Sequence, residues 1–256
     1  MINIFKKFFI YLITLSTLIL SGVNSVNAIG SDAMSTAIKG SGDIITESSV
    51  LKMSPYSLNL NHISFISSPA VKVYAHPGSQ SAISITTDEN ILELLDIRIN
   101  ENENKIDITS SRMISPTAFY IEITVPLKEF VGKGKFDLDI TSEKLFILNV
   151  DGDTIGKINL VKANNAAVTI NGSANLNFSG ISSEFDLKAR GSCNIKADEF
   201  VTNNCKVCIY GNCTVSVFAY KSLDLYAEGF GKFNYAGNPQ KFNKVVNGMC
   251  KIQKIN

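Results

Sequence analysis

The chain has 256 residues, with 24 basic and 23 acidic side chains, two histidines and no tryptophan. This near balance of charge leaves no basic face of the kind that binds nucleic acid, so we expect no nucleic-acid partner. Isoleucine, valine, asparagine and serine recur along the chain, which is typical of strands joined by tight turns. The length allows one large all-β domain or two small ones.

Residues 1–28 have the pattern of a secretory signal peptide. Two lysines precede an apolar run over 8–20, and Val26 and Ala28 supply the small residues of a cleavage site. The alternative is an uncleaved anchor, but this run of about 13 residues is short for a bilayer, which needs ~20. We therefore expect an exported protein, either periplasmic, at the cell surface or secreted, with no transmembrane span after cleavage.

The segment 29–131 is predicted to form an irregular β-rich N-terminal half. A helical turn is expected where Asp88 precedes Glu89 and a short apolar group, because an aspartate can cap the first turn. Polar residues over 100–105 separate two alternating apolar stretches and predict a hairpin. We expect this half to cap the remainder of the chain and to blunt its exposed sheet edge.

Glycines recur across 132–256 at steps of 18 to 20 residues. The series is Gly132, Gly152, Gly172, Gly191, Gly211, Gly229 and Gly248. Apolar residues stand two and four positions before most of these glycines and four and six positions after them, with polar residues between. This is period-2 alternation on both sides of a glycine corner. It places Leu176, Ile195 and Val215 in one inward column.

An all-β fold follows, with a right-handed parallel β-helix-like solenoid of ~19–20-residue turns over 132–256. The repeat is too short for a propeller blade of ~40 residues. A coil that rises ~4.8 Å per turn would instead bury each repeat against the next. The alternative is an antiparallel sandwich with evenly spaced hairpins.

Several short motifs resemble one known family. They are Gly-Ser-Gly-Asp-Ile at 40–44, Asp-Glu-Asn-Ile-Leu at 88–92, and Gly-Ser-x-Asn-apolar turns at 172–176 and 191–195. Their order is similar to that of the putative auto-transporter adhesin, head-GIN domain family, over about residues 38 to 252. The resemblance implies an exported β-rich repeat domain with a conjectural adhesin role, and it supplies no catalytic or ligand residues.

Patterns that would carry catalysis are missing from the sequence. Asp137 and Asp139, and likewise Asp151 and Asp153, could bind calcium or act as paired carboxylates. Strand alternation instead places Asp137 and Asp139 on an outer, solvated face. We expect no enzyme activity, no cofactor and no metal. The alternative is a carbohydrate-active enzyme on a β-helix, which would need charged residues converging from adjacent turns in one groove.

All five cysteines follow residue 190. Cys193 and Cys213 stand two residues after consecutive glycines of the series, which would bring their Cα atoms to about 4.8 Å, within disulfide reach. Either they form a bond or they are small buried apolar residues. Cys213 and Cys250 should not bond, because the repeat of Gly231 lies between them.

Two aromatic residues near the C-terminus fall outside the inward columns. Tyr226 and Phe230 are therefore candidate surface contacts, although they could also cover the last repeats as a cap. The partner is unknown, with a cell-surface or envelope component as the expected class. Adhesion and pure scaffolding both remain open.

Overall fold

Regular structure in this chain is almost entirely β-strand. The computed structural model describes residues 37–66 and 69–255, so the predicted signal peptide lies outside the described residues. Within these ranges a single four-residue helix accompanies the strands, which confirms the all-β prediction. No helix in the described part is long and apolar enough to cross a membrane.

The elements follow one another in a simple order. They are β1 (Ile38–Lys39), β2 (Ile44–Val50), β3 (Tyr56–Leu60), β4 (Ser64–Phe65), β5 (Val71–Ala75), β6 (Ala82–Asp88), α1 (Glu89–Leu92), β7 (Leu95–Asn100), β8 (Lys105–Ser110), β9 (Met113–Ser115), β10 (Phe119–Ile123), β11 (Leu127–Ala236) and β12 (Lys241–Lys254).

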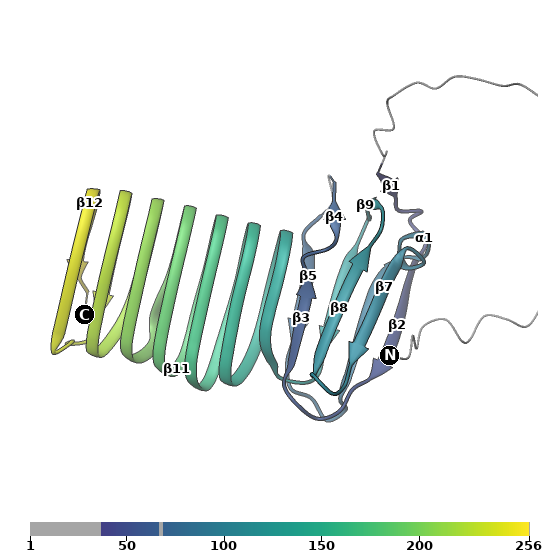
Figure 1. Cartoon of the computed structure of the whole chain (residues 1–256), viewed down its shortest axis with the longest axis horizontal. Coiled ribbons are helices and arrows are strands. Elements are labelled where there is room, and N and C mark those ends of the chain that lie inside the picture. The colour runs from purple at the N-terminus through teal and green to yellow at the C-terminus, as the bar shows by residue number, and fades with distance from the viewer. Residues whose placement is uncertain (1–36, 67–68, 256) are drawn as a thin grey trace, which may run out of the picture.

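Most strands belong to one curled, half-barrel sheet. Its order is β2-β6-β10-β5-β11-β3-β8-β7, and β12 pairs with β11. The early part of β11 receives β3 at Leu127–Gly132 and β5 at Phe136–Ile140, both in parallel. From β11 the sheet therefore extends in two directions, through β5, β10 and β6 to β2 and through β3 and β8 to β7. β2 and β7 are its two end strands (Figure 1). A small sheet, β1-β9-β4, completes this half.

Successive repeats of β11 lie side by side (Figure 1). At the C-terminal end β12 pairs in parallel with the segment 19 residues earlier, so that Gly248 stands beside Gly229. A Cβ built on Gly191 would lie 2.1 Å from the carbonyl oxygen of Gly172. Only glycine fits at such a corner, because any side chain would overlap the backbone of the previous repeat.

The glycine series begins at Gly134 and not, as predicted, at Gly132. A Cβ on Gly152 would lie 2.1 Å from the Gly134 carbonyl oxygen, and Gly134 has a φ of +139°. At Gly132 a Cβ would instead strike the ring of Phe136 at 2.5 Å. The two glycines are only two residues apart, so both satisfy the repeat spacing. Repeat spacing alone cannot tell which of the two glycines stacks against Gly152. The contact of Gly132 with the Phe136 ring shows that it is Gly134.

The inward columns form the core of the repeats. Leu176, Ile195 and Val215 are all fully buried, as their position four residues after a glycine predicts. On the outer side, the Asn194 side-chain amide donates to the Asn175 side-chain oxygen of the previous repeat at 3.0 Å. The predicted alternation is therefore present, with apolar residues inside and polar side chains outside.

Candidate functional site

A cleft of 1140 Å³ lies between β2 and β7, the two end strands of the curled sheet. Ile45 and Glu47 of β2 and Ile97 of β7 line it. Glu47 pairs with the buried Ile85 of β6, so its side chain is on the inner side of β2. Among residues 37–66 and 69–255, the outer edge of neither end strand pairs with another strand.

The cleft combines an apolar floor with an acidic rim. Leu92 and Ile97 are buried in its floor. Glu47, Glu89 and Glu93 are exposed at its margin, and no ion pair is formed by them within the described part of the chain. The cleft therefore favours a partner that carries apolar and cationic groups.

The single arginine of the cleft is already paired. The Arg98 guanidinium donates to the Asp96 carboxylate, with Nε to Oδ2 at 2.9 Å. This hydrogen bond and the adjacent negative charge raise the pKa of Arg98. Because Arg98 offsets Asp96, the three glutamates determine the net charge of the rim.

Asp88, the residue before the cleft residue Glu89, is buried and fully hydrogen-bonded. Its carboxylate accepts hydrogen bonds from the Gly42 amide at 2.8 Å, the Thr117 amide at 2.8 Å and the Thr117 hydroxyl at 2.7 Å. Burial by itself raises the pKa of Asp88, but these hydrogen bonds outweigh it and leave the pKa below its usual value. The predicted helical turn is present as α1, but the Asp88 side chain does not cap it.

The glycine turn that precedes β2 packs directly on this carboxylate. A Cβ on Gly40 would lie 2.3 Å from the carboxyl carbon of Asp88. The Ser41 amide donates to the Asn90 side-chain oxygen at 2.9 Å, and the Asn90 amide group donates to the Lys39 carbonyl at 2.8 Å. The two motifs at 40–44 and 88–92 thus form one polar lock, which joins the start of β2 to the helix that leads into β7.

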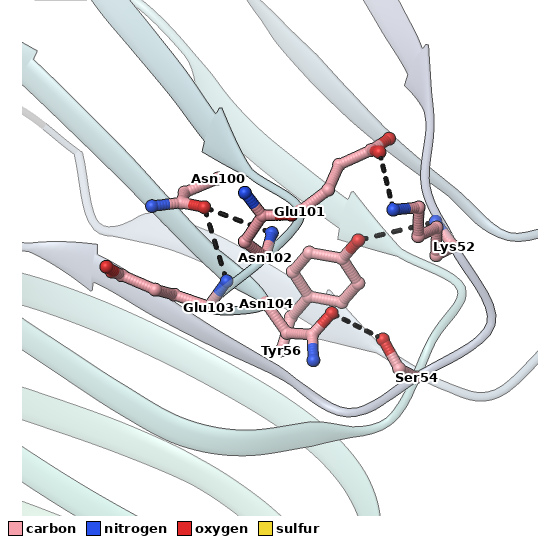
Figure 2. A network of polar contacts seen from close by, with 8 residues as sticks. All are labelled: Lys52, Ser54, Tyr56, Asn100, Glu101, Asn102, Glu103 and Asn104. Atoms are coloured by element: carbon pink, nitrogen blue, oxygen red, sulfur yellow. Dashed lines mark hydrogen bonds and ion pairs between the residues drawn. The ribbon is translucent and has the colours of Figure 1, made fainter. Parts of the chain in front are cut away.

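A second network joins the other ends of the same two strands (Figure 2). Lys52, which follows β2, pairs with Glu101 at 2.9 Å, and the Ser54 hydroxyl donates to the Asn104 side-chain oxygen at 2.8 Å. The buried Tyr56 hydroxyl accepts from the Lys52 amide at 3.3 Å. The β2–β3 connection is therefore fixed to the β7–β8 turn, so the cleft is bridged at both ends.

The turn between β7 and β8 is the predicted polar hairpin. The Asn100 side-chain oxygen accepts from the Asn102 amide at 3.1 Å and the Glu103 amide at 3.2 Å (Figure 2). Asn104 has a φ of +50°, a conformation that asparagine tolerates better than most residues. The turn thus carries its own hydrogen bonds in addition to its links with the β2–β3 connection.

The two candidate contact residues lie outside the cleft, on the last repeats. Tyr226 is half-buried and stacks on Tyr210 with ring centroids 5.5 Å apart, whereas Phe230 is 58% exposed. The paired strand places Val245 beside Tyr226 and Met249 beside Phe230, and both of these neighbours are exposed. The four side chains form an outer apolar patch around the glycine corner.

The cysteine register agrees with the stacked repeats. Cys193 and Cys213 are both buried and free, and the Cys213 thiol donates to the Gly191 carbonyl oxygen at 3.8 Å. The neighbouring Cys213 side chain raises the pKa of Cys193, and burial raises it further. Cys250 stands beside Gly231. The disulfide between Cys193 and Cys213 stays a prediction.

The acidic pairs considered for chemistry remain on the outer face. Asp151 and Asp153 are exposed, and Asp139 pairs with His76 at 3.1 Å. Within residues 37–66 and 69–255, no three histidine, cysteine or acidic side chains are close enough to hold a metal ion. Sequence reasoning missed the cleft itself. The sequence feature that could have indicated the cleft is the acidic cluster that follows Asp88, opposite the glycine turn at 40–44.

A comparison with protein families decides the relationship. The family model described as "Putative auto-transporter adhesin, head GIN domain" matches residues 61–239. The chain belongs to this family. The match confirms the resemblance seen in the sequence motifs and lies inside the range of 38 to 252 expected for it. No curated protein matches the chain.

Solved structures share the fold of this head GIN domain. A putative adhesin from Bacteroides fragilis aligns with a TM-score of 0.65 at 18% identity, over 86% of this chain and 100% of that one. A putative lipid binding protein from Parabacteroides distasonis gives 0.58 at 22%, with coverage of 86% and 100%. A putative adhesin from Parabacteroides merdae gives 0.56 at 16%, with coverage of 86% and 99%. At these identities the likeness shows the fold alone.

Proposed function

We propose that this protein is an exported, non-enzymatic binding protein of the cell envelope that holds an extended polypeptide in the cleft between β2 and β7. The observation that carries the proposal is the cleft itself. It combines an apolar floor with two strand edges and three glutamates that have no partner within residues 37–66 and 69–255. The description of the family as a putative adhesin supports a binding role.

The strand edges favour a polypeptide over other ligands. Each edge presents backbone N–H and C=O groups, which can pair with an added strand. Alternate side chains of that strand would lie against Leu92 and Ile97, while lysine or arginine side chains would meet the glutamates. A fatty acid would bring its carboxylate toward the same glutamates and would be repelled.

Rigidity of the cleft supports the same conclusion. The Asp88 lock and the Lys52–Glu101 network join the β2 side of the cleft to the β7 side at both ends. A cleft that is already ordered in the free protein lowers the conformational entropy cost of binding. Affinity then depends on the partner's own flexibility.

The remainder of the chain would serve as the scaffold. The parallel register between β11 and β12, offset by 19 residues, supports a right-handed parallel β-helix for 132–256. The predicted signal peptide at 1–28 supports export. Tyr226, Phe230 and their exposed neighbours offer a second contact surface on the last repeats.

Catalysis on carbohydrate is the rival function, and the described structure gives it little support. The pairs at Asp137 and Asp151 lie on the outer face, where they do not converge with other acids in a deep groove. Activity on a polysaccharide that disappears in Asp137→Asn or Asp151→Asn, with the fold retained, would establish the rival.

A labelled peptide tests the proposed function. A fluorescein-labelled heptapeptide of alternating lysine and valine should bind saturably to the chain without residues 1–28, as measured by fluorescence anisotropy. A glutamate–valine heptapeptide and palmitate should not bind. Glu47→Lys combined with Glu93→Lys should weaken lysine–valine binding at least about tenfold, which corresponds to about 1.4 kcal/mol.

Glu199→Lys provides the matched control, because Glu199 is an exposed acid on the repeats. It should leave the affinity unchanged. Equal binding of the two heptapeptides, or equal loss of affinity in the control and in the cleft variant, would contradict the proposal. Saturable binding of palmitate in their place would assign the cleft to a lipid.

A further inference from the structure

We propose that the polypeptide held in the cleft is β12 of a second copy, so that copies assemble head to tail. The inference rests on the proposed function, because it needs the cleft to accept a strand. It names the partner from charge, edge geometry and strand direction at the two ends of the molecule.

The first argument is charge. Four lysines stand in β12, and no acidic residue follows Glu228 in the sequence. The lysines are Lys241, Lys244, Lys251 and Lys254. At the other end of the molecule the cleft carries three glutamates that form no ion pair with any described residue. The basic strand therefore complements the acidic cleft, and opposite charges that meet across an interface favour and orient association.

The second argument is the open edge of β12. Within the described ranges, β12 pairs with β11 on one side and with nothing on the other. Its inward residues Phe242, Val246 and Ile252 are only partly buried, although the residues they pair with, Leu223, Ala227 and Phe233, are fully enclosed. A strand added to β12 would bury these residues and satisfy its backbone groups.

Lysines of β12 also occupy inward columns. Lys244 stands beside Leu225 and Lys254 stands beside Tyr235, where earlier repeats have apolar residues. Both lysines are exposed. An inward lysine at an edge opposes pairing with another apolar edge. It is compatible with an edge that carries an inward acid, and Glu47 of β2 is such an acid.

The third argument is strand direction on the side of the sheet that carries β2. Segments that follow the glycines, such as Phe136–Ile140, continue through β5, β10 and β6 to β2. The first two pairings are parallel and the last two antiparallel, so β2 runs in the same direction as 249–254. In the parallel register that sets Lys254 beside Glu47, residues 251–254 can therefore pair with residues 44–47 of β2.

The other side of the sheet is equally compatible. Segments that precede the glycines, such as Leu127–Gly132, continue through β3 and β8 to β7. Only the last of these pairings is antiparallel, so residues 241–247 would pair antiparallel with β7. Seven residues would then face the six of β7.

The resulting contact is heterologous and does not close on itself. β2 and β7, whose residues line the cleft, lie at the opposite end of the molecule from β12 (Figure 1). A contact between two different surfaces at opposite ends leaves one of each free on every dimer, so further copies can add. Head-to-tail binding thus predicts chains of copies whose length rises with concentration.

Sedimentation velocity of the chain without residues 1–28 tests the inference. The weight-average mass should rise with protein concentration and fall as salt screens the charges. The cleft variant E47K/E93K and the β12 variant K244E/K254E should each remain monomeric. An equimolar mixture of the two should assemble again, because each variant then meets the opposite charge on its neighbour.

The control variant E199K/K206E, changed at two exposed positions of the repeats, should assemble like the parent. A monomer at all concentrations, or a mixture that does not restore assembly, would overturn the inference. The inference would also be overturned if a chain that begins at residue 37 assembles and a chain that begins at residue 29 does not. Residues 29–36 of the same chain would then occupy the cleft in place of a second copy. Binding of the lysine–valine peptide without self-association refutes only the second copy, whereas failure to bind that peptide refutes the proposed function.

Discussion

The stacked repeats and the N-terminal strands are stabilised by different kinds of contact. In the repeats, a residue is held by the equivalent residue 18 to 20 positions away, as in the contact of Gly191 with Gly172. In the N-terminal half, specific polar networks join segments that have no repeat relation, as in the three hydrogen bonds to Asp88. The repeats therefore tolerate outward substitution almost anywhere, whereas the N-terminal half depends on a few side chains that also shape the cleft.

The largest expected effect comes from a charge placed in the repeat core. Ile195→Asp puts a carboxylate without a partner at a fully buried position and should destabilise the fold by about 4 kcal/mol or more. Lys196→Asp, at the adjacent exposed position, should change stability by less than about 0.5 kcal/mol. Thermal denaturation measures both. Equal melting temperatures would show that the column is not buried.

Substitution of one glycine in the repeats and one in the N-terminal half compares the two regions directly. Gly191 and Gly42 both have positive φ, at +114° and +91°, but a Cβ meets the Gly172 backbone at Gly191 and open space at Gly42. Gly42→Ala should cost about 1 to 2 kcal/mol from backbone conformation alone. Gly191→Ala should cost roughly 3 to 5 kcal/mol, because the repeats must also separate. Urea denaturation that ranks the two variants in the opposite order would refute the stacking.

A disulfide between Cys193 and Cys213 is the next prediction in size. It would close a loop of about 20 residues and stabilise the oxidised chain by roughly 3 kcal/mol relative to the reduced one. Peptide mapping of unreduced, alkylated protein should recover this pair alone. A Cys213–Cys250 linkage would show that the register of the repeats is wrong, since Gly231 stands between these two cysteines. A Cys205–Cys208 linkage would also contradict the strand, since residues three apart in β11 lie about 10 Å apart and face opposite sides.

The Asp88 lock gives the N-terminal half its own dependence on pH. The pKa of Asp88 is lower in the folded state than in the unfolded chain, where it is about 3.9. Its contribution is therefore fully present above pH ~4 and is lost as the pH falls through the folded-state pKa. Asp88→Asn should cost about 1 to 3 kcal/mol at neutral pH and should lessen the acid-dependent loss.

The control for this change is Asp153→Asn, at an exposed position in the repeats. It should alter neither the stability at neutral pH nor its acid dependence. Stability curves from pH 2 to pH 7 compare the three proteins. An unchanged acid transition in Asp88→Asn would show that this carboxylate does not hold the cleft.

The smallest effect is a gain of stability within the repeats. The Thr154 hydroxyl is buried and has no hydrogen-bond partner in the described part of the chain, whereas the Thr202 hydroxyl donates to the Phe218 carbonyl at 2.5 Å. Thr154→Val should therefore stabilise the fold by about 1 kcal/mol, and Thr202→Val should destabilise it. Differential scanning calorimetry measures both. A loss of stability in Thr154→Val would indicate that its hydroxyl has a partner, such as a buried water.

The repeats were predictable because their order is local and periodic. Burial of Ile195 and the pairing of Cys250 with Gly231 both follow from counting residues after a glycine. Counting failed only at Gly132, where a second glycine two residues later satisfies the same spacing and the Phe136 ring determines which one stacks. Periodicity identifies the columns, and side-chain volume determines where they begin.

The cleft was not predictable in the same way. The sequence placed a polar residue at Asp88 and suggested a helix cap, but the carboxylate instead accepts bonds from Gly42 and Thr117, which are distant in sequence. Such partners follow from the order in which β6, β2 and β10 pair in the sheet, and no local pattern encodes that order. The hairpin over 100–105 was predicted, whereas its ties to Lys52 and Ser54 were not.

Hydrogen–deuterium exchange in the presence of the lysine–valine heptapeptide tests the central claim, that polypeptide binds in the cleft between β2 and β7. Bound peptide should slow exchange of the edge amides at 44–50 and 95–100 and should leave the repeats around Tyr226 and Phe230 unchanged. Protection confined to the Tyr226 and Phe230 patch, with no change in β2 or β7, would contradict the account.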